Sequence, residues 1–141
     1  MGVRGRCVDR DDQRRFAERC SVAFVAVNAE QAEDWNGASG QEFIDQRERH
    51  ERMLSRLKAR LLAAAWIQDG EEVLDVGCGC GDLTILAARA AGGGHAVGAD
   101  FSRIQVAAAR RLAACAGVAN ARFEVADVQV YLSRPRVSTS C

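Results

Sequence analysis

Three glycines at alternate positions are the residues of this chain whose type and spacing point most clearly to chemistry. Gly77, Gly79 and Gly81 follow an apolar run in the segment EEVLDVGCGCGDL, residues 71–83, and Asp75 lies inside that run. Glycine lets a backbone turn sharply and lets a ligand approach without meeting a Cβ atom. A tight turn that binds nothing is the weaker interpretation, because each interior glycine costs about 0.5–1 kcal/mol. The spacing therefore predicts a ligand against this loop.

Two further acids occupy matching positions downstream. Asp100 follows the apolar run that begins at His95, and Asp127 follows the run that begins at Phe123. Ionised carboxylates accept hydrogen bonds on two oxygens, so they suit ligands that present hydroxyl or amine donors. An aspartate at the end of a strand also commonly caps a helix or forms a turn. The position of each acid beside the glycine loop favours a role in ligand binding over a role in capping.

The elements that must position these residues alternate along the chain. Apolar residues at helical spacing predict a long helix over residues 40–65, with Ser39 as its N-cap, and helices after the glycine loop and after Ser102. Short apolar runs predict strands at residues 73–76, 95–99 and 123–126. The first run lacks alternation, which is typical of a strand covered on both faces.

Strands that alternate with helices predict parallel pairing with crossover connections. The expected fold is α/β: a partial doubly wound, Rossmann-like arrangement with about three parallel strands and flanking helices. Ligands bind at the carboxyl ends of the strands in such sheets. The glycines, Asp100 and Asp127 all fall at that edge, and this coincidence carries more weight than any one motif.

Composition narrows the classes of partner. The chain has 141 residues, 48% of them hydrophobic and 27% charged, with zero formal net charge. One domain is expected, and nothing in the charge favours a nucleic-acid or membrane partner. No apolar stretch approaches the ~20 residues of a membrane span, and the N-terminus has no apolar core typical of a secretory signal. We therefore expect a cytoplasmic protein.

Cysteine and histidine usage predicts no metal site. Of six cysteines, Cys78 and Cys80 are separated by one residue, closer than zinc or redox pairs. Reduced thiols are the expectation. His50 falls on the long predicted helix, where we expect it at the surface, and His95 opens a strand.

The glycine spacing argues against two common phosphate motifs. The dinucleotide fingerprint G-x-G-x-x-G/A would need glycine or alanine where this chain has Asp82 or Thr84, and the P-loop pattern is absent. The spacing G-x-G-x-G therefore does not favour a pyrophosphate.

The segments VLDVGCGCGDLT, VGADFS and FEVADVQ, in this order, resemble the class I S-adenosylmethionine-dependent methyltransferases. The resemblance covers about residues 33–131 and is nearest to the bacterial small-molecule branch that includes quinone-biosynthesis enzymes. It implies S-adenosyl-L-methionine as cofactor and methyl transfer to a small-molecule acceptor.

The resemblance also implies roles for individual residues. The glycine loop with Cys78 would pass under the methionine part, and Asp75 would help to hold the loop and the cofactor's amino end. Asp100 would accept both ribose hydroxyls, and Phe101 would pack beside the adenine. At the adenine end, Asp127 would accept from the exocyclic amine and Val128 would lie beside the ring. Trp35, with Asn36 and Gly37, would fold over the cofactor, and Gln46 would also reach toward the cofactor. It names no catalytic base.

The end of the chain departs from the family pattern. After Asp127 only VQVYLSRPRVSTSC follows, whereas the resemblance implies further strands and an acceptor-binding half. We expect an N-terminal arm over residues 1–32, the first half of a methyltransferase domain over 33–131 and a disordered tail over 132–141. The first strand would lie at an open sheet edge, which favours self-association. A truncated, non-catalytic fragment that binds cofactor or a partner and a nicotinamide-dependent oxidoreductase half-domain remain the alternatives.

Overall fold

The structure, a computed structural model, describes residues 29–128. The apolar run at residues 21–27 and the expected tail at 132–141 lie outside the described residues. The elements in chain order are α2 (Ala29–Asn36), α3 (Ala38–Asp45), α4 (Arg47–Ala65), β1 (Glu72–Val76), α5 (Asp82–Ala91), β2 (His95–Asp100), α6 (Arg103–Cys115) and β3 (Ala121–Val125). The helix α2 crosses the expected boundary between arm and domain at residue 32.

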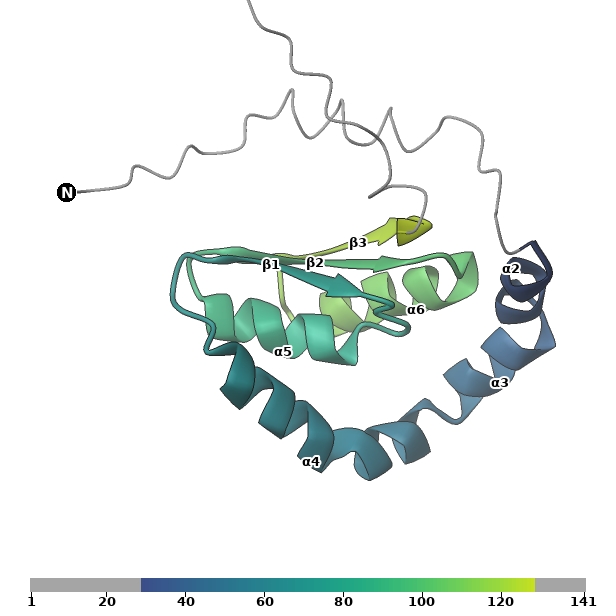
Figure 1. Cartoon of the computed structure of the whole chain (residues 1–141), viewed down its shortest axis with the longest axis horizontal. Helices are drawn as coiled ribbons and strands as arrows, with labels where there is room; N and C mark the ends of the chain where they lie inside the picture. Colours follow the sequence, from purple (N-terminus) through teal and green to yellow (C-terminus); the bar gives the residue numbers. More distant parts are fainter. Residues whose placement is uncertain (1–28, 129–141) are drawn as a thin grey trace, which may run out of the picture.

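The strands form one parallel sheet in the order β1-β2-β3. Val73 pairs with Ala96 and Gly98 pairs with Phe123, so the carboxyl ends of β1 and β2 meet at one edge. The crossover helices α5 and α6 lie against the same face of the sheet, and α2, α3 and α4 curve around them (Figure 1). The predicted α/β fold with three parallel strands is confirmed.

Small residues let the helices approach the sheet closely. Between α5 and β2, the buried cluster consists of Ala87, Ala88 and Ala96. Larger side chains fill the space below β3, where Phe123 is buried with Val106 and Ile85. Dispersion contacts in such dense packing fix the helices relative to the strands, and the strand ends that carry the candidate site inherit this rigidity.

The single long helix predicted over residues 40–65 is wrong. The chain forms α3 and α4, with a break at Gln46, whose φ of −93° and ψ of 11° leave the helical region. The N-cap position of α3 is Gly37, and Ser39 lies inside the helix with its hydroxyl donating to Asp34 Oδ1 at 2.7 Å. The break has a tertiary cause, because α3 packs against α6 while α4 packs against α5.

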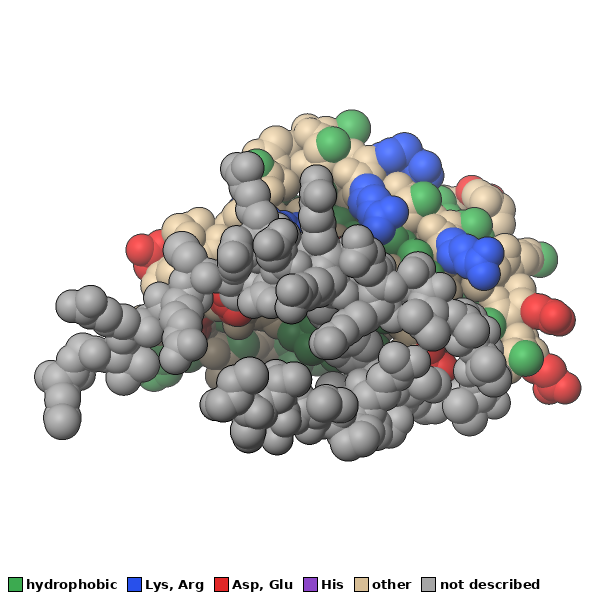
Figure 2. Space-filling view, turned by 90° about the horizontal axis from the view of Figure 1, so that it is seen from above, with side chains coloured by type: hydrophobic (Ala, Val, Ile, Leu, Met, Phe, Trp, Pro, Cys, Tyr) green, Lys and Arg blue, Asp and Glu red, His purple; other side chains and the backbone are tan. Residues whose placement is uncertain are grey.

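The predicted burial of β1 on both faces is also wrong for the described residues. Burial alternates along the strand, and Leu74 and Val76 are 58% and 56% exposed. No helix of residues 29–128 covers the sheet face opposite α5 and α6 (Figure 1). Seen from above, hydrophobic side chains are visible near the middle of this face (Figure 2). The described part of the chain thus leaves one sheet face without a helical layer.

The start of α6 forms as its sequence predicts. The Ser102 hydroxyl accepts a hydrogen bond from the Gln105 backbone N–H at 3.4 Å, which satisfies one of the free donors in the first turn. Cys115 is exposed at the end of the helix. Within residues 29–128, no helix combines the length and the apolar character that crossing a membrane requires.

Candidate functional site

The glycine loop continues the edge of the sheet beyond β1. The backbone N–H groups of Gly77 and Cys78 both donate to the Ala99 carbonyl oxygen, at 2.8 and 3.2 Å. The glycines Gly77, Gly79 and Gly81 have φ of +74°, +54° and +81°, in the left-handed region that favours glycine. The loop is therefore held against β2 while it turns into α5, whose first backbone N–H groups point toward the same place.

The glycines differ in what surrounds them. A Cβ atom at Gly81 would lie 2.4 Å from Phe123 Cε1, so this position is glycine because the core leaves no room. A Cβ atom at Gly77 would meet nothing within 4 Å, so no atom of the protein fills the space beside this glycine. The space beside Gly77 is the part of the loop that a ligand could enter.

Asp100 joins the glycine loop to the start of α6. Its Oδ2 accepts from the Gly79 N–H at 2.9 Å, and its Oδ1 accepts from the Ser102 N–H at 2.8 Å. The side chain is buried, with 9% of the residue exposed. A carboxylate has about four acceptor sites, so these two bonds leave capacity for ligand hydroxyls. The same group therefore braces the loop and offers free lone pairs at the sheet edge.

Asp75 and Cys78 lie beneath the loop. Asp75 accepts from the Thr84 hydroxyl at 2.6 Å. Burial raises the pKa of Asp75, with the Thr84 hydrogen bond opposing this effect and the Asp100 charge adding to it. Burial, with smaller effects from the same two carboxylates, raises the pKa of the Cys78 thiol to about 12. The Cys78 sulfur packs beside Gly98, where it would lie 2.9 Å from a Cβ atom. Its side chain is thus a packing group, and only its backbone follows the glycine loop.

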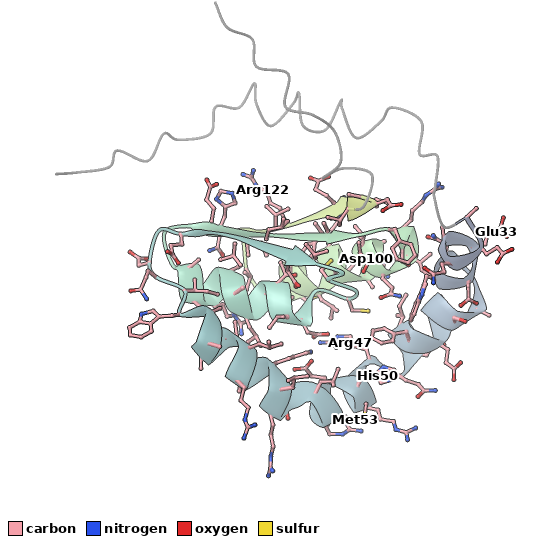
Figure 3. The ribbon with its side chains drawn as sticks, in the orientation of Figure 1. Glu33, Arg47, His50, Met53, Asp100 and Arg122 are labelled. Atoms are coloured by element: carbon pink, nitrogen blue, oxygen red, sulfur yellow. The ribbon has the colours of Figure 1, made fainter. Side chains whose placement is uncertain are left out.

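A cavity of about 240 Å³ separates the loop from α4. Its lining includes Asp75, Gly77 and Gly79 on one side and Arg47 and His50 on the other. In Figure 3, Arg47 and His50 lie on the side of α4 that faces the sheet, whereas Met53 lies on its outer side. The sequence prediction that His50 is a surface residue is wrong, because its ring is half-buried in this lining.

Sequence reasoning missed the contribution of α4 to the site. Residues that line the cavity recur on one face of this helix: Arg47, His50, Glu51, Leu54, Leu57, Lys58 and Leu61. Their spacing of three or four residues is the signal that could have found them, since residues at this spacing share one face of a helix. The charged members are paired: Arg47 with Asp82 at 2.7 Å, and Lys58 with Glu51.

The segment around Trp35 docks against the start of α6. The Ser102 hydroxyl donates to the Trp35 carbonyl oxygen at 2.7 Å, and the Arg103 backbone N–H donates to Asn36 Oδ1 at 2.7 Å. A Cβ atom at Gly40 would lie 1.9 Å from the Trp35 carbonyl oxygen, so glycine is required for this contact. Trp35 and Asn36 thereby fix the turn that follows Asp100.

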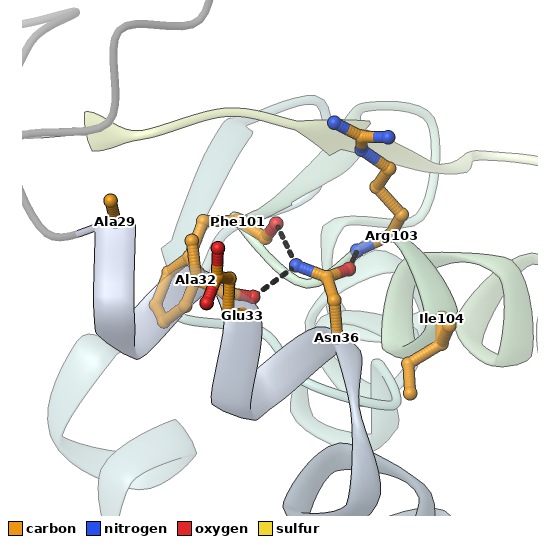
Figure 4. Close-up of a pocket in the computed structure, with 7 residues that line it drawn as sticks. All are labelled: Ala29, Ala32, Glu33, Asn36, Phe101, Arg103 and Ile104. Atoms are coloured by element: carbon orange, nitrogen blue, oxygen red, sulfur yellow. Dashed lines mark hydrogen bonds between the residues drawn. The ribbon is translucent and has the colours of Figure 1, made fainter.

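Phe101 lines a second hollow, of about 450 Å³, beneath α2. Ala32, Glu33 and Asn36 line it from α2, and Arg103 and Ile104 line it from α6 (Figure 4). The structure therefore brings Asp75, the glycine loop and Asp100 together, and it places Phe101 in a neighbouring hollow. Asp127 and Val128 follow the end of β3, half-buried, on the far side of Asp100 from β1. Gln46 stands at the break between α3 and α4, outside the lining of both hollows.

The chain is an α/β domain whose parallel sheet carries a glycine loop and a braced carboxylate at adjacent strand ends, the edge at which such domains generally bind their ligands. Residues 67–135 match a family model described as "Methyltransferase domain". Trans-aconitate 2-methyltransferase from Delftia acidovorans (strain DSM 14801 / SPH-1) is 32% identical over 102 residues, which cover 72% of this chain and 34% of that protein. Residues 67–135 belong to the methyltransferase-domain family, as the resemblance predicted, and the chain spans about a third of the length of this curated relative.

Two solved structures show a partial likeness. An RNA methyltransferase from Salinibacter ruber in complex with S-adenosyl-L-homocysteine is 32% identical, with a TM-score of 0.49 over 52% of this chain and 48% of that chain. A SAM-dependent methyltransferase from Thiobacillus denitrificans, also in complex with S-adenosyl-L-homocysteine, is 35% identical, with a TM-score of 0.45 over 50% of this chain and 29% of that chain.

Proposed function

We propose that this chain binds S-adenosyl-L-methionine and forms the cofactor-binding part of an enzyme that methylates a small-molecule acceptor. The observation that carries the proposal is the Gly79 N–H to Asp100 hydrogen bond of 2.9 Å, which places the carboxylate beside the open glycine loop. The membership of residues 67–135 in the methyltransferase-domain family supports it.

The residues present fit such a cofactor. The open space beside Gly77 admits a ligand to the backbone, and Asp100 retains lone pairs for two vicinal ribose hydroxyls. Asp75 would hold the amino end, with Cys78 and Gly81 completing the loop. On the nucleoside side, Phe101 and Val128 would lie along the adenine and Asp127 would accept from its amine, while Trp35 braces the turn after Asp100.

The cofactor, when bound, supplies an activated methyl group on a sulfonium. The chain's own contribution is to hold the nucleoside at the strand ends and the amino-acid end in the cavity between α4 and the glycine loop. This positioning lowers the entropy cost of bringing the methyl group to an acceptor. The chain spans 34% of the length of the curated relative, and we assign none of its residues to the acceptor and propose no catalytic base.

The test has two stages. Calorimetric titration with S-adenosyl-L-homocysteine measures cofactor binding, and a labelled-methyl assay on phenolic and quinone acceptors measures transfer. We expect binding without turnover from this chain alone, since it carries the cofactor half of the domain. Turnover by the chain alone would contradict the half-site assignment, and absence of binding by a folded chain would contradict the cofactor assignment.

We also propose self-association through the exposed β1 edge and cytoplasmic function. Leu74 and Val76 support the first, because β1 is the edge strand of the described sheet, and an edge strand with exposed apolar side chains favours pairing with another chain. The thiols of Cys78, Cys80 and Cys115 are free, which supports a reducing compartment. Fractionation of cells that produce the tagged chain would test the second proposal, and recovery outside the cytoplasmic fraction would contradict it.

A further inference from the structure

His50 carries a buried nitrogen that lacks a hydrogen-bond partner. Among the described residues, its Nδ1 is the one buried side-chain polar atom in this condition. Leaving such an atom without a partner is destabilising, so an unsatisfied group of this kind commonly marks a place where something else binds. The residue lines the cavity between α4 and the glycine loop, so a ligand that enters this cavity lies beside its ring.

Aromatic packing holds the His50 ring in place. The ring stacks on Phe43 with centroids 4.5 Å apart and planes at 25°. Phe43 in turn meets Trp35 edge-on, at 6.1 Å and 76°. This series of rings starts in the segment that braces the turn after Asp100, so the position of the nitrogen is set by the same docking that fixes the nucleoside end of the site. A held donor binds with little loss of side-chain freedom.

The other charged groups around the cavity have partners. Arg47 pairs with Asp82 of α5, Lys58 pairs with Glu51, and Asp75 of β1 accepts from the Thr84 hydroxyl. The cavity of about 240 Å³ is smaller than the pockets of about 300–1,000 Å³ that take whole ligands. It is therefore suited to one end of a larger molecule. Its two walls differ in charge: two basic side chains, one glutamate and a histidine lie along α4, whereas two carboxylates, of Asp75 and Asp82, lie on the side of the loop.

We propose that His50 is a cofactor-binding residue that donates a hydrogen bond from Nδ1 to the α-carboxylate of the cofactor's methionine part. This inference rests on the proposed function and assigns the orientation of the amino-acid end within the site. The carboxylate accepts hydrogen bonds only, so it faces α4, and the ammonium group donates only, so it faces Asp75. His50 thereby distinguishes the complete cofactor from nucleosides that lack the amino acid.

The experiment compares two ligands that share the nucleoside. S-Adenosyl-L-homocysteine carries the amino acid, and 5′-methylthioadenosine lacks it. His50→Phe keeps a ring for stacking on Phe43 and removes the nitrogen, while His50→Asn returns an amide nitrogen near the position of Nδ1. His95→Phe, at the start of β2, is the matched control because it replaces the chain's other histidine.

We expect H50F to weaken S-adenosyl-L-homocysteine binding about tenfold to a hundredfold, as the loss of a hydrogen bond to a charged group does. Binding of 5′-methylthioadenosine should stay unchanged, H50N should regain part of the lost affinity, and H95F should match the wild type. An H50F variant that binds S-adenosyl-L-homocysteine as tightly as the wild type would overturn the inference. So would an equal loss for both ligands, because His50 would then act on the nucleoside end. Failure of both ligands to bind the folded wild type would overturn the proposed function itself.

Discussion

Asp100 has two roles at the scale of single residues. Its oxygens hold the Gly79 and Ser102 N–H groups, and the same carboxylate is the proposed acceptor for the ribose hydroxyls. Because the backbone bonds position the oxygens before a ligand arrives, the group is preorganised for binding. A carboxylate placed in this way serves both the fold and the site, so its loss should be measurable in each.

Replacing Asp100 with alanine should weaken S-adenosyl-L-homocysteine binding about tenfold to a hundredfold, because hydrogen bonds to charged groups contribute about 1.5–3 kcal/mol. The free energy of unfolding should also fall, since two buried N–H donors lose their acceptor; D100N, which keeps one neutral oxygen, should lie between. Titration calorimetry and urea unfolding measure the two effects. Asp69→Ala is the control, because that carboxylate also accepts from a loop N–H, of Gly93, at 2.8 Å but lies at the opposite end of β1. Equal affinity in D100A and wild type would contradict the ribose assignment.

Asp75 should make stability depend on pH. Burial raises the pKa of its carboxyl above the usual 3.8, so the folded state binds the proton more tightly than the unfolded state. Stability from this group is greatest below the unfolded pKa and is lost as pH rises through the raised folded pKa. Asp75→Asn does not titrate, and its amide oxygen can still accept from Thr84.

We therefore expect the wild type to lose stability relative to D75N as the pH rises above about 4, the ordinary pKa of an aspartate. Urea unfolding of both proteins across this range measures the difference, in which the effects of all other groups cancel. A difference that does not change with pH, or one that grows in favour of the wild type, would show that the Asp75 pKa is not raised.

At the scale of elements, substitutions of two loop glycines should affect stability and cofactor affinity differently. Gly81→Ala should destabilise the protein strongly, by about 2–4 kcal/mol, because its Cβ would collide with Phe123 where repacking a dense core is costly. Gly77→Ala meets nothing within 4 Å, so it should cost only about 1 kcal/mol of left-handed strain while it weakens cofactor binding. Thermal unfolding and calorimetry measure the two quantities.

Gly70→Ala provides the matched control for Gly77→Ala. Gly70 has φ of +85°, and a Cβ there also meets nothing within 4 Å, but it lies in the turn before β1. Both variants should lose similar stability, and only the variant at Gly77 should lose affinity. If both bind equally well, the space beside Gly77 is not a ligand space.

The sequence predicted those elements whose signals are local. The strand ends and the Ser102 cap were predictable because apolar runs, glycines and capping side chains act over a few residues. The break at Gln46 was not, because no proline or glycine marks it and α3 and α4 bend to pack against different helices. The place of His50 in the cavity lining was missed for the same reason: its surroundings are Phe43 and a loop far along the chain.

At the scale of the whole molecule, the sheet has one covered face and one without helices in the described part. Sequence pattern alone indicated a strand buried on both faces, since Val73, Leu74 and Val76 are apolar on both sides of the pleat. The structure shows that only one side has a covering layer among residues 29–128. An apolar run of this kind indicates that both faces of a strand are suited to apolar contacts. It does not indicate whether a helical layer covers each face.

The exposed face of β1 should make the chain associate with itself. Leu74→Lys should shift the protein toward monomer, because a charge on an exposed strand flank opposes edge-to-edge pairing. Met53→Lys is the control, because this similarly exposed apolar residue lies on the outer side of α4. Sedimentation velocity over a concentration series measures the effect. A wild type that stays monomeric at every concentration would contradict the proposed association.

The most direct test of the proposed cofactor site is a calorimetric titration of the whole wild-type chain with S-adenosyl-L-homocysteine. A parallel titration with reduced nicotinamide dinucleotide tests the alternative ligand. One molecule of S-adenosyl-L-homocysteine should bind per chain. The dinucleotide should give no saturable heat, because the glycine spacing of the loop does not match the dinucleotide-binding fingerprint. A folded chain that ignores the first ligand, or that takes up the second, would show that the crevice at Gly77, Gly79 and Asp100 serves another purpose.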